Sequence, residues 1–144
     1  MSFAEEVQRF IDRTNMRANT VVKRVILSIG REVIRKSPVG NPDLWVSPAP
    51  PGYVGGRFKG NWQLGVGVAP EGTVDIHDED GGGTLAHIAL QIPEQAAGKV
   101  YYITNNMPYA QALEDGHSSQ SAPGNMVAGT VADFQRYIRQ AAQE

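Results

Sequence analysis

The sequence lacks cysteine altogether, and no apolar run approaches the roughly 18 residues that a membrane-spanning helix needs. The absence of cysteine excludes disulfides, thiolate zinc sites and a cysteine nucleophile. The first residues, Met-Ser-Phe-Ala-Glu-Glu, are acidic where a signal peptide is basic. We therefore expect a soluble protein that is made in the cytoplasm and has no membrane partner.

The chain has 144 residues, of which 41% are hydrophobic, and a net charge of −2, which suits one domain with one core over residues 1–144. Its charge is unevenly distributed. Residues 1–36 hold eight basic and four acidic side chains, whereas residues 37–144 hold five basic and eleven acidic ones. Opposed charges of this kind favour docking within one molecule or between neighbouring copies, and both alternatives are open.

Residues 1–36 are predicted to form one long helix that begins with the capping box Ser2-x-x-Glu5 and ends before Pro38. Its apolar residues recur at three- and four-residue steps and so form one stripe. At about 1.5 Å per residue the helix is about 50 Å long, against about 40 Å for the diameter of a globule of this size. Either it bends, for example at Gly30, or its stripe is partly buried by another subunit.

The rest of the chain predicts a small sheet and a second long helix. Residues 62–69 alternate between apolar and small or polar side chains, which is typical of a strand with one bare face that another backbone can approach. The expected segments are an extended Pro/Gly-rich loop at 38–61, a sheet region with short helices at 62–122, and a C-terminal helix at 123–144. The sheet region is expected to hold a short strand at Val74 and Ile76, a helix at 85–92, a central strand at 99–105 and a helix from Asn106 to Glu114.

These segments predict an α+β fold, with a long N-terminal helix and a C-terminal helix packed on a small antiparallel β-sheet. Trp45, Tyr53 and Phe58 lie in the predicted 38–61 loop. Loops of this length in a compact domain are commonly functional, so these aromatic side chains either contact a partner or fold back over the core.

We expect no enzyme, no cofactor and no metal. Gly65-x-Gly67 lacks the third glycine of a dinucleotide-binding loop, and the three histidines lie at least ten residues apart. The weak alternative is a metal-dependent hydrolase using His77, Asp78 and Asp80, although their spacing does not match a calcium loop and a solvated acidic turn is the preferred interpretation.

A nucleic-acid-binding module is another alternative. Arg9, Arg13 and Arg17 recur every four residues and so line one flank of the first helix, where they could contact phosphates. The chain is slightly acidic, with a pI near 5.9, and holds no base-reading motif. A flank that faces solvent or a neighbouring subunit is the preferred interpretation.

Two groups of motifs resemble the tail-completion, or head–tail joining, proteins of the neck of tailed bacteriophages. One is the segment 101–116, Tyr-Tyr-Ile-Thr-Asn-Asn-Met-Pro-Tyr-Ala-Gln-Ala-Leu-Glu-Asp-Gly, followed by Ser-Ala-Pro-Gly-Asn-Met-Val at 121–127 before the last helix. The other is Ser37-Pro38-Val39 after the long helix, followed by Gly-Arg-Phe-Lys-Gly-Asn-Trp at 56–62. The order of these elements matches that of the family over nearly the whole chain.

The resemblance implies a non-enzymatic structural protein of the virion that forms a ring of identical subunits, six-fold being favoured. It implies as partners the head connector or adaptor and the tail terminator or tail tube proteins, with DNA passing through the channel without sequence-specific binding. A tail terminator is the closest alternative. Tyr109, Leu113 and Glu114 are expected to fix the corner between strand and helix. The candidate interface residues are Trp45, Tyr53, Arg57, Phe58, Trp62, Tyr109, Glu114, Arg9, Arg13 and Arg17.

Overall fold

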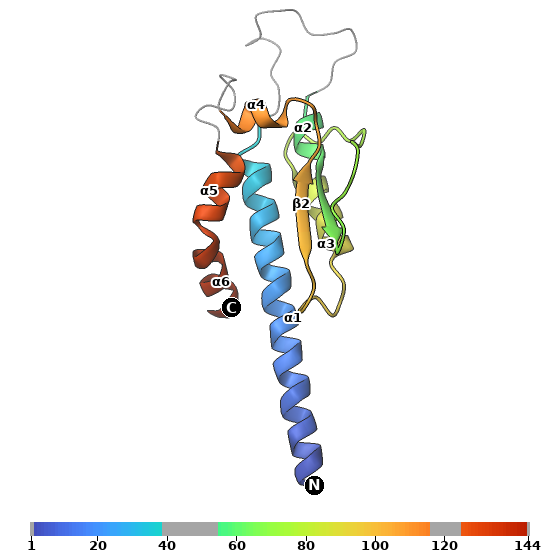
Figure 1. Ribbon diagram of the computed structural model, residues 1–144, viewed down its shortest axis with the longest axis vertical. Coiled ribbons are helices and arrows are strands. Elements are labelled where there is room, and N and C mark those ends of the chain that lie inside the picture. The colour runs from blue at the N-terminus through green and yellow to red at the C-terminus, as the bar shows by residue number, and fades with distance from the viewer. Residues whose placement is uncertain (1, 39–54, 116–124, 144) are drawn as a thin grey trace, which may run out of the picture.

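The computed structural model describes residues 2–38, 55–115 and 125–143, and it confirms the expected α+β fold. One long helix runs through the molecule, with the C-terminal helices on one side and the sheet on the other (Figure 1). Its elements in chain order are α1 (Phe3–Arg35), α2 (Arg57–Gly60), β1 (Trp62–Val66), α3 (Gly82–Gln91), β2 (Tyr101–Asn105), α4 (Ala110–Glu114), α5 (Met126–Ala132) and α6 (Phe134–Gln143).

Helix α1 begins at the predicted capping box. The Ser2 hydroxyl accepts a hydrogen bond from the Glu5 amide at 3.1 Å, and the Glu5 carboxylate accepts one from the Ser2 amide at 3.3 Å. No bend is needed at Gly30, which is buried where α3 crosses. A methyl group there would lie 3.5 Å from Ile88, in ordinary van der Waals contact, so the crossing itself does not require glycine.

Strands β1 and β2 pair antiparallel, with Leu64 opposite Ile103. Strand β1 is shorter than predicted because Gly67, with φ of +79°, turns the chain. The bare face of β1 is approached by another backbone, as expected. A methyl group on Gly65 would lie 2.1 Å from the Val68 carbonyl oxygen.

The described residues hold a two-stranded sheet, so the predicted strand at Val74 and Ile76 is absent and β2 is not central. The amide of the Asn61 side chain replaces the missing ladder. Its oxygen accepts from the Val74 amide at 2.8 Å, and its nitrogen donates to the Val74 carbonyl at 3.0 Å. A single side chain therefore holds this segment extended without a strand partner.

Two helix predictions also need correction. Asn106 does not start a helix, because α4 begins at Ala110, and the Asn106 side chain instead donates to the carbonyls of Pro70 and Gly72. The single C-terminal helix is in fact α5 and α6, which are separated at Asp133. The predicted loop at 38–61 contains the short helix α2. Trp45 and Tyr53, and the Ser-rich loop after Gly116, lie outside the described residues.

The core lies where α1, α3, β1 and α5 meet, in the half of the molecule away from the N-terminus (Figure 1). Its buried apolar side chains are Ile26, Val33, Ile34, Phe58, Trp62, Leu64, Ile88, Met107, Leu113 and Met126. The described residues contain no helix that is both long and apolar enough to cross a membrane.

Candidate interaction surface

Aromatic side chains from three elements meet at one corner of the molecule. The rings of Phe58 and Trp62 are 6.1 Å apart in an edge-to-face arrangement, and the ring of Tyr109 lies 5.8 Å from that of Phe58. Phe58 and Trp62 are each only 4% exposed. Their side chains therefore build the core of the corner and do not offer surface to a partner, whereas Tyr109 is exposed at its edge.

Ser37 connects this corner to α1 and α5. Its hydroxyl accepts a hydrogen bond from the Trp62 indole at 2.8 Å and donates to the Val33 carbonyl at 2.6 Å. The Met126 sulfur lies 3.5 Å from the same oxygen. Ser37 is buried. It follows the first helix directly, and its hydroxyl also fixes the indole of Trp62.

Glu114 caps the N-terminus of α5. Its carboxylate accepts hydrogen bonds from the amides of Val127 at 2.9 Å and Ala128 at 3.0 Å, and its carbonyl accepts one from Asn125 at 2.8 Å. A negative charge at this end of a helix is favourable. Glu114 therefore ties α4 to α5, whereas it was expected at the corner between strand and helix. Leu113 beside it is buried.

The described residues of the two resembling motif groups thus come together in space, and a groove opens beside them. The groove has a volume of about 350 Å³ and lies between β2, α4 and α5. It is lined by Phe58, Trp62, Ile103, Asn105, Ala110, Gln111, Glu114, Met126, Val127 and Ala128. Arg57, a candidate for partner contact, is exposed on α2 next to this corner.

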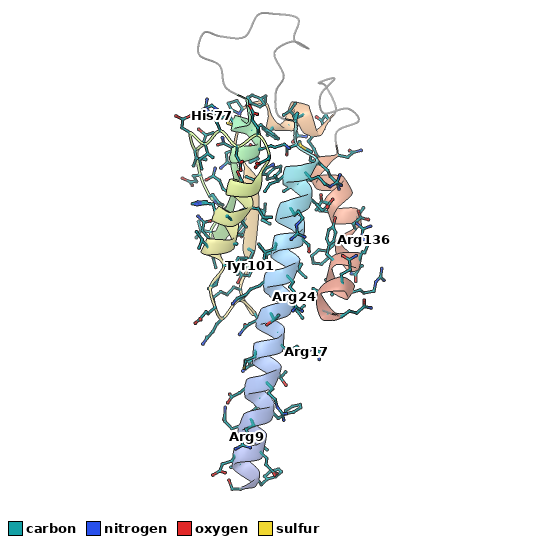
Figure 2. The ribbon with its side chains drawn as sticks, turned by 180° about the vertical axis from the view of Figure 1, so that it is seen from behind. Arg9, Arg17, Arg24, His77, Tyr101 and Arg136 are labelled. Carbon is teal, nitrogen blue, oxygen red and sulfur yellow. The ribbon has the colours of Figure 1, made fainter. Side chains whose placement is uncertain are left out.

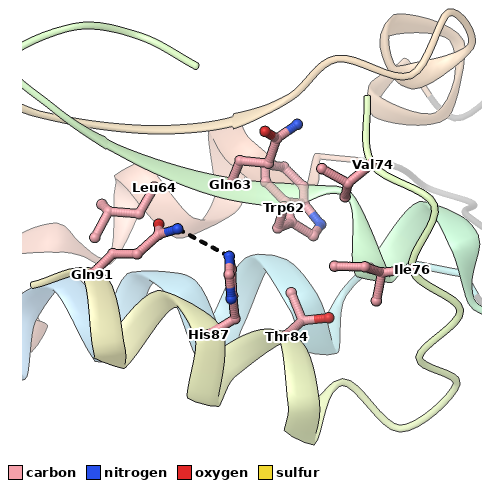
Figure 3. Close-up of a pocket in the computed structure, with 9 residues that line it drawn as sticks. Trp62, Gln63, Leu64, Val74, Ile76, Thr84, His87 and Gln91 are labelled. Atoms are coloured by element: carbon pink, nitrogen blue, oxygen red, sulfur yellow. Dashed lines mark hydrogen bonds between the residues drawn. The ribbon is translucent and has the colours of Figure 1, made fainter. Parts of the chain in front are cut away.

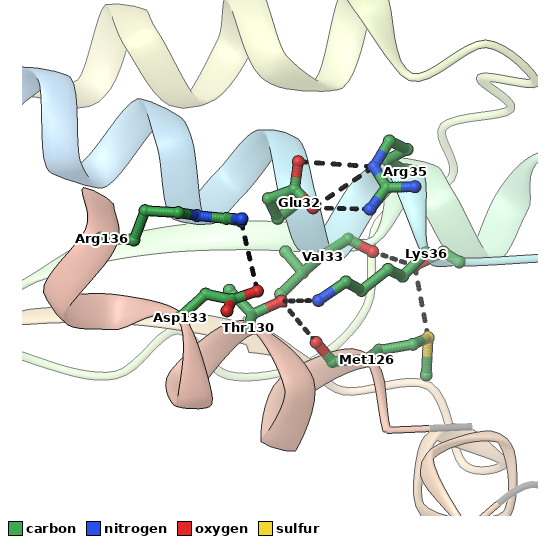
Figure 4. A network of polar contacts seen from close by, with 9 residues as sticks. Glu32, Val33, Arg35, Lys36, Met126, Thr130, Asp133 and Arg136 are labelled. Atoms are coloured by element: carbon green, nitrogen blue, oxygen red, sulfur yellow. Dashed lines mark hydrogen bonds and ion pairs between the residues drawn. The ribbon is translucent and has the colours of Figure 1, made fainter. Parts of the chain in front are cut away.

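A second polar network fastens α5 to the end of α1 (Figure 4). The Lys36 ammonium donates to the Thr130 hydroxyl at 3.1 Å, and Thr130 donates to the Met126 carbonyl at 2.6 Å. Nearby, Arg35 pairs with Glu32 at 2.7 Å, and this hydrogen bond lowers the pKa of the Glu32 carboxyl. Of these contacts, the Lys36–Thr130 hydrogen bond joins α5 to the end of α1, whereas the Arg35–Glu32 pair lies within α1.

The lower part of α1 projects from the body of the molecule, with Arg9 near its free end (Figure 2). We call residues 3–17 of α1 the arm, because every one of them is exposed. Of the basic flank formed by Arg9, Arg13 and Arg17, Arg17 contacts the body of the molecule. Its guanidinium donates to the Ala142 carbonyl at 3.2 Å, and the Arg24 guanidinium donates to the Ala141 carbonyl at 3.1 Å. These two cations stabilise the C-terminal end of α6.

The arm carries equal numbers of opposite charges. Arg9, Arg13 and Arg17 are balanced by Glu5, Glu6 and Asp12. A flank that binds phosphates works by an excess of positive charge, which the arm does not have. Its most distinctive exposed side chains are instead apolar: Phe3, Val7, Phe10, Ile11 and Met16.

Sequence reasoning missed a second exposed apolar stripe on the C-terminal helices. All the apolar residues there were expected to face the core, but they divide into two faces. Tyr137 and Ala141 are buried, whereas Val127, Val131 and Phe134 are 44%, 65% and 40% exposed. We call these last three the α5–α6 stripe. The signal was present in the sequence, because apolar residues occur in adjacent pairs, at 126–127 and 137–138, and such pairs form a wider stripe than one buried face requires.

The acidic turn that was considered for a metal has another use. The Asp78 carboxylate accepts from the amides of Gly81 at 3.1 Å and Thr84 at 2.6 Å and from the Thr84 hydroxyl, so it caps α3. His77 pairs instead with Asp75 at 3.1 Å. Within the described ranges, no three His, Asp or Glu side chains gather closely enough to hold a metal ion.

A small hollow of about 60 Å³ lies between α3 and β1, where His87 bonds Gln91 at 2.9 Å (Figure 3). Its walls are mostly apolar, with Leu64 and Ile76 on the sheet side. The polar side chains in its wall are those of Gln63, Thr84, His87 and Gln91. Thr84 is already bonded to Asp78, and His87 to Gln91.

A comparison of this chain with models of protein families, with curated proteins and with solved structures finds no match in any of the three. A function is therefore proposed from the residues of this chain and their arrangement.

Proposed function

We propose that this chain is a non-enzymatic structural protein of the neck of a tailed bacteriophage. In this role it completes the tail and joins it to the head connector as one subunit of an oligomeric ring. The resemblance of its motifs to the tail-completion family supports the proposal. So does the use of those motif residues, which lie far apart in the sequence and together build one corner of the fold through Ser37, Trp62 and Glu114.

One observation carries the proposal: the bare apolar stripe of the arm. Phe3 and Phe10 are 81% and 64% exposed. Apolar surface on this scale is unfavourable in water, and on a helix that is otherwise rich in charge it marks a face that another molecule covers. A long helix that extends beyond the body of its own subunit presents a face that a neighbouring copy can cover, and this suits an assembly of identical subunits.

The proposal is tested by deleting the coding sequence for this chain from the phage genome that carries it. Electron microscopy of the resulting lysate is expected to show full heads and finished tails that remain separate. Supplying the wild-type chain from a plasmid should restore joined, infectious particles.

Other outcomes would contradict this function. Tails of uncontrolled length in the deletion lysate would assign the chain to the tail terminator instead. Normal yields of infectious particles would show that the chain is not a neck protein at all. A plasmid carrying the Leu90→Gln variant, which alters an exposed apolar residue of α3 that belongs to neither stripe, is the matched control and should complement fully.

A further inference from the structure

The apolar stripe of the arm is the continuation of a stripe that the body already covers. Val7, Val21 and Val25 lie on one face of α1, separated by multiples of about one turn. Val21 and Val25 are half-buried beside the rest of the fold, whereas Val7 is exposed together with Phe3, Phe10 and Ile11. The covering ends where α6 ends, because Arg17 contacts Ala142 next to the last residues of that helix.

The same chain offers a second bare stripe that fits the first. Val127 and Val131 lie one turn apart on α5, and Phe134 begins α6 just after the break at Asp133. The α5–α6 stripe, from residue 127 to 134, spans about 11 Å at 1.5 Å per residue, and the apolar stripe of the arm, from Phe3 to Ile11, spans about 12 Å. Two helical surfaces of similar length and like chemistry can pack side by side.

One copy cannot bring its own two stripes together. Helix α1 is straight, and the arm extends away from α5 and α6 beyond the C-terminal end of α6 (Figure 1). The α5–α6 stripe lies on a different side of those helices from Tyr137 and Ala141, which are buried. A second copy of this chain is therefore the occupant that the geometry favours.

We propose that the arm of one copy packs on the α5–α6 stripe of the next copy. This inference rests on the proposed assembly of the chain into a ring, and it names the contact through which that ring forms. In the proposed ring this contact is heterologous: the arm of each copy packs on the stripe of the next copy, and the contact repeats until the ring closes. In such a ring each subunit covers both of its bare stripes.

The contact is apolar in character and of modest size. A phenylalanine offers roughly 150–250 Å² of surface. The four apolar side chains of the arm stripe therefore supply on the order of 400 Å², about half of what one partner contributes to a standard stable interface. Association should consequently be weak for a single contact, reinforced by ring closure, and insensitive to salt because the arm has no excess charge.

Three variants test the contact. The arm variant combines Phe3→Gln and Phe10→Gln, the stripe variant combines Val127→Gln and Val131→Gln, and Leu90→Gln is the matched control. All five positions are exposed and helical, and glutamine preserves helix propensity, so each variant should fold. Circular dichroism and thermal melting verify the fold before association is measured.

Analytical ultracentrifugation over a hundredfold range of concentration is the measurement. The wild type and Leu90→Gln should self-associate to the same extent at low and high salt. The arm and stripe variants should each associate at least tenfold more weakly than the wild type. An equimolar mixture of the two variants should form a one-to-one heterodimer and nothing larger, because it retains one intact arm facing one intact stripe.

Specific results overturn the inference. A wild-type chain that stays monomeric, association that neither variant weakens, or a mixture that forms no heterodimer would each show that this contact does not exist. Association that only the arm variant loses would indicate arm-to-arm pairing. None of these results decides the neck function, which is tested by the deletion lysate. If that lysate shows separate heads and tails while the arm and stripe variants still self-associate like the wild type, the contact is rejected and the neck function stands.

Discussion

At the scale of single residues, the buried polar side chains of this chain join segments that are far apart in the sequence. Asn61 is fully buried and uses both atoms of its amide to hold Val74, thirteen residues further on. Ser37 is buried between α1, β1 and α5. Buried polar groups of this kind are costly unless every bond is made, so each position tolerates few other residues.

Replacement of Ser37 by alanine should lower the free energy of unfolding by about 1–3 kcal/mol, because it leaves the indole N–H of Trp62 buried without an acceptor. Urea denaturation monitored by circular dichroism, which reads both backgrounds alike, measures the loss. Thr73→Ala, at an exposed hydroxyl, is the control and should be nearly neutral. In a Trp62→Phe background the Ser37→Ala change should cost less, since its hydrogen-bond partner is already gone, and equal costs in the two backgrounds would refute this role for Ser37.

At the scale of elements, helices with a local signal could be predicted and those without one could not. The bounds of α1 follow from a capping box at Ser2 and a proline at 38, and the actual helix ends within a residue or two of the prediction. The break between α5 and α6 at Asp133 has no proline or glycine at the position itself, so periodicity alone indicated one helix. The segment with Val74 and Ile76 was expected to be a strand because apolar residues alternate there. The same alternation occurs when an extended segment is held by the Asn61 side chain and not by a strand.

Helix α3 depends on a carboxylate that precedes it. Burial by itself would raise the pKa of Asp78, but the hydrogen bonds from Thr84 and Gly81 outweigh burial and hold the pKa below its ordinary value. A carboxyl with a lowered folded-state pKa contributes stability above its unfolded-state pKa of about 3.9, and the contribution is lost as the pH falls through the folded-state value.

Asp78→Asn should therefore lower the free energy of unfolding at pH 7 by about 1 kcal/mol, because the amide keeps one acceptor oxygen but loses the second oxygen and the negative charge. Below about pH 4 the difference between variant and wild type should shrink as Asp78 itself becomes protonated. Urea denaturation at a series of pH values measures both. Asp75→Asn, at a side chain that is exposed and caps no helix, is the control, and a difference that stays constant down to pH 2 would contradict the explanation.

At the scale of the whole molecule, the length of α1 against the size of the body could be worked out from the sequence, and the structure confirms that the helix overhangs. The candidate site could be predicted only in part. Phe58 was expected either to contact a partner or to fold back over the core, and Trp62 was a candidate interface residue. Both are buried, with Tyr109 against Phe58 and Ser37 bonded to Trp62, from positions that no local pattern reveals. The α5–α6 stripe could not be predicted from the sequence for the same reason. Tertiary packing decides which of two adjacent apolar faces of a helix is buried.

The molecule therefore consists of a body and an arm that is helical because it extends a helix already formed in the body. Extension adds residues without a new nucleation cost, which explains how a stretch whose residues are all exposed stays helical. Deletion of residues 2–14 would start the helix at Asn15, a good N-cap residue. Because every deleted residue is exposed, the free energy of unfolding should change by no more than about 0.5 kcal/mol.

Urea denaturation at low protein concentration, where self-association does not add to stability, is the right measurement for this deletion. Sedimentation of the same protein at high concentration should show a loss of association similar to that of the arm variant. A truncated chain that loses more than about 2 kcal/mol would show that the arm contributes to the fold of its own copy, since changes at exposed sites without buried contacts are rarely that large. The arm would then belong to the body, and the division of α1 into a covered half and a half reserved for a neighbour would have to be abandoned.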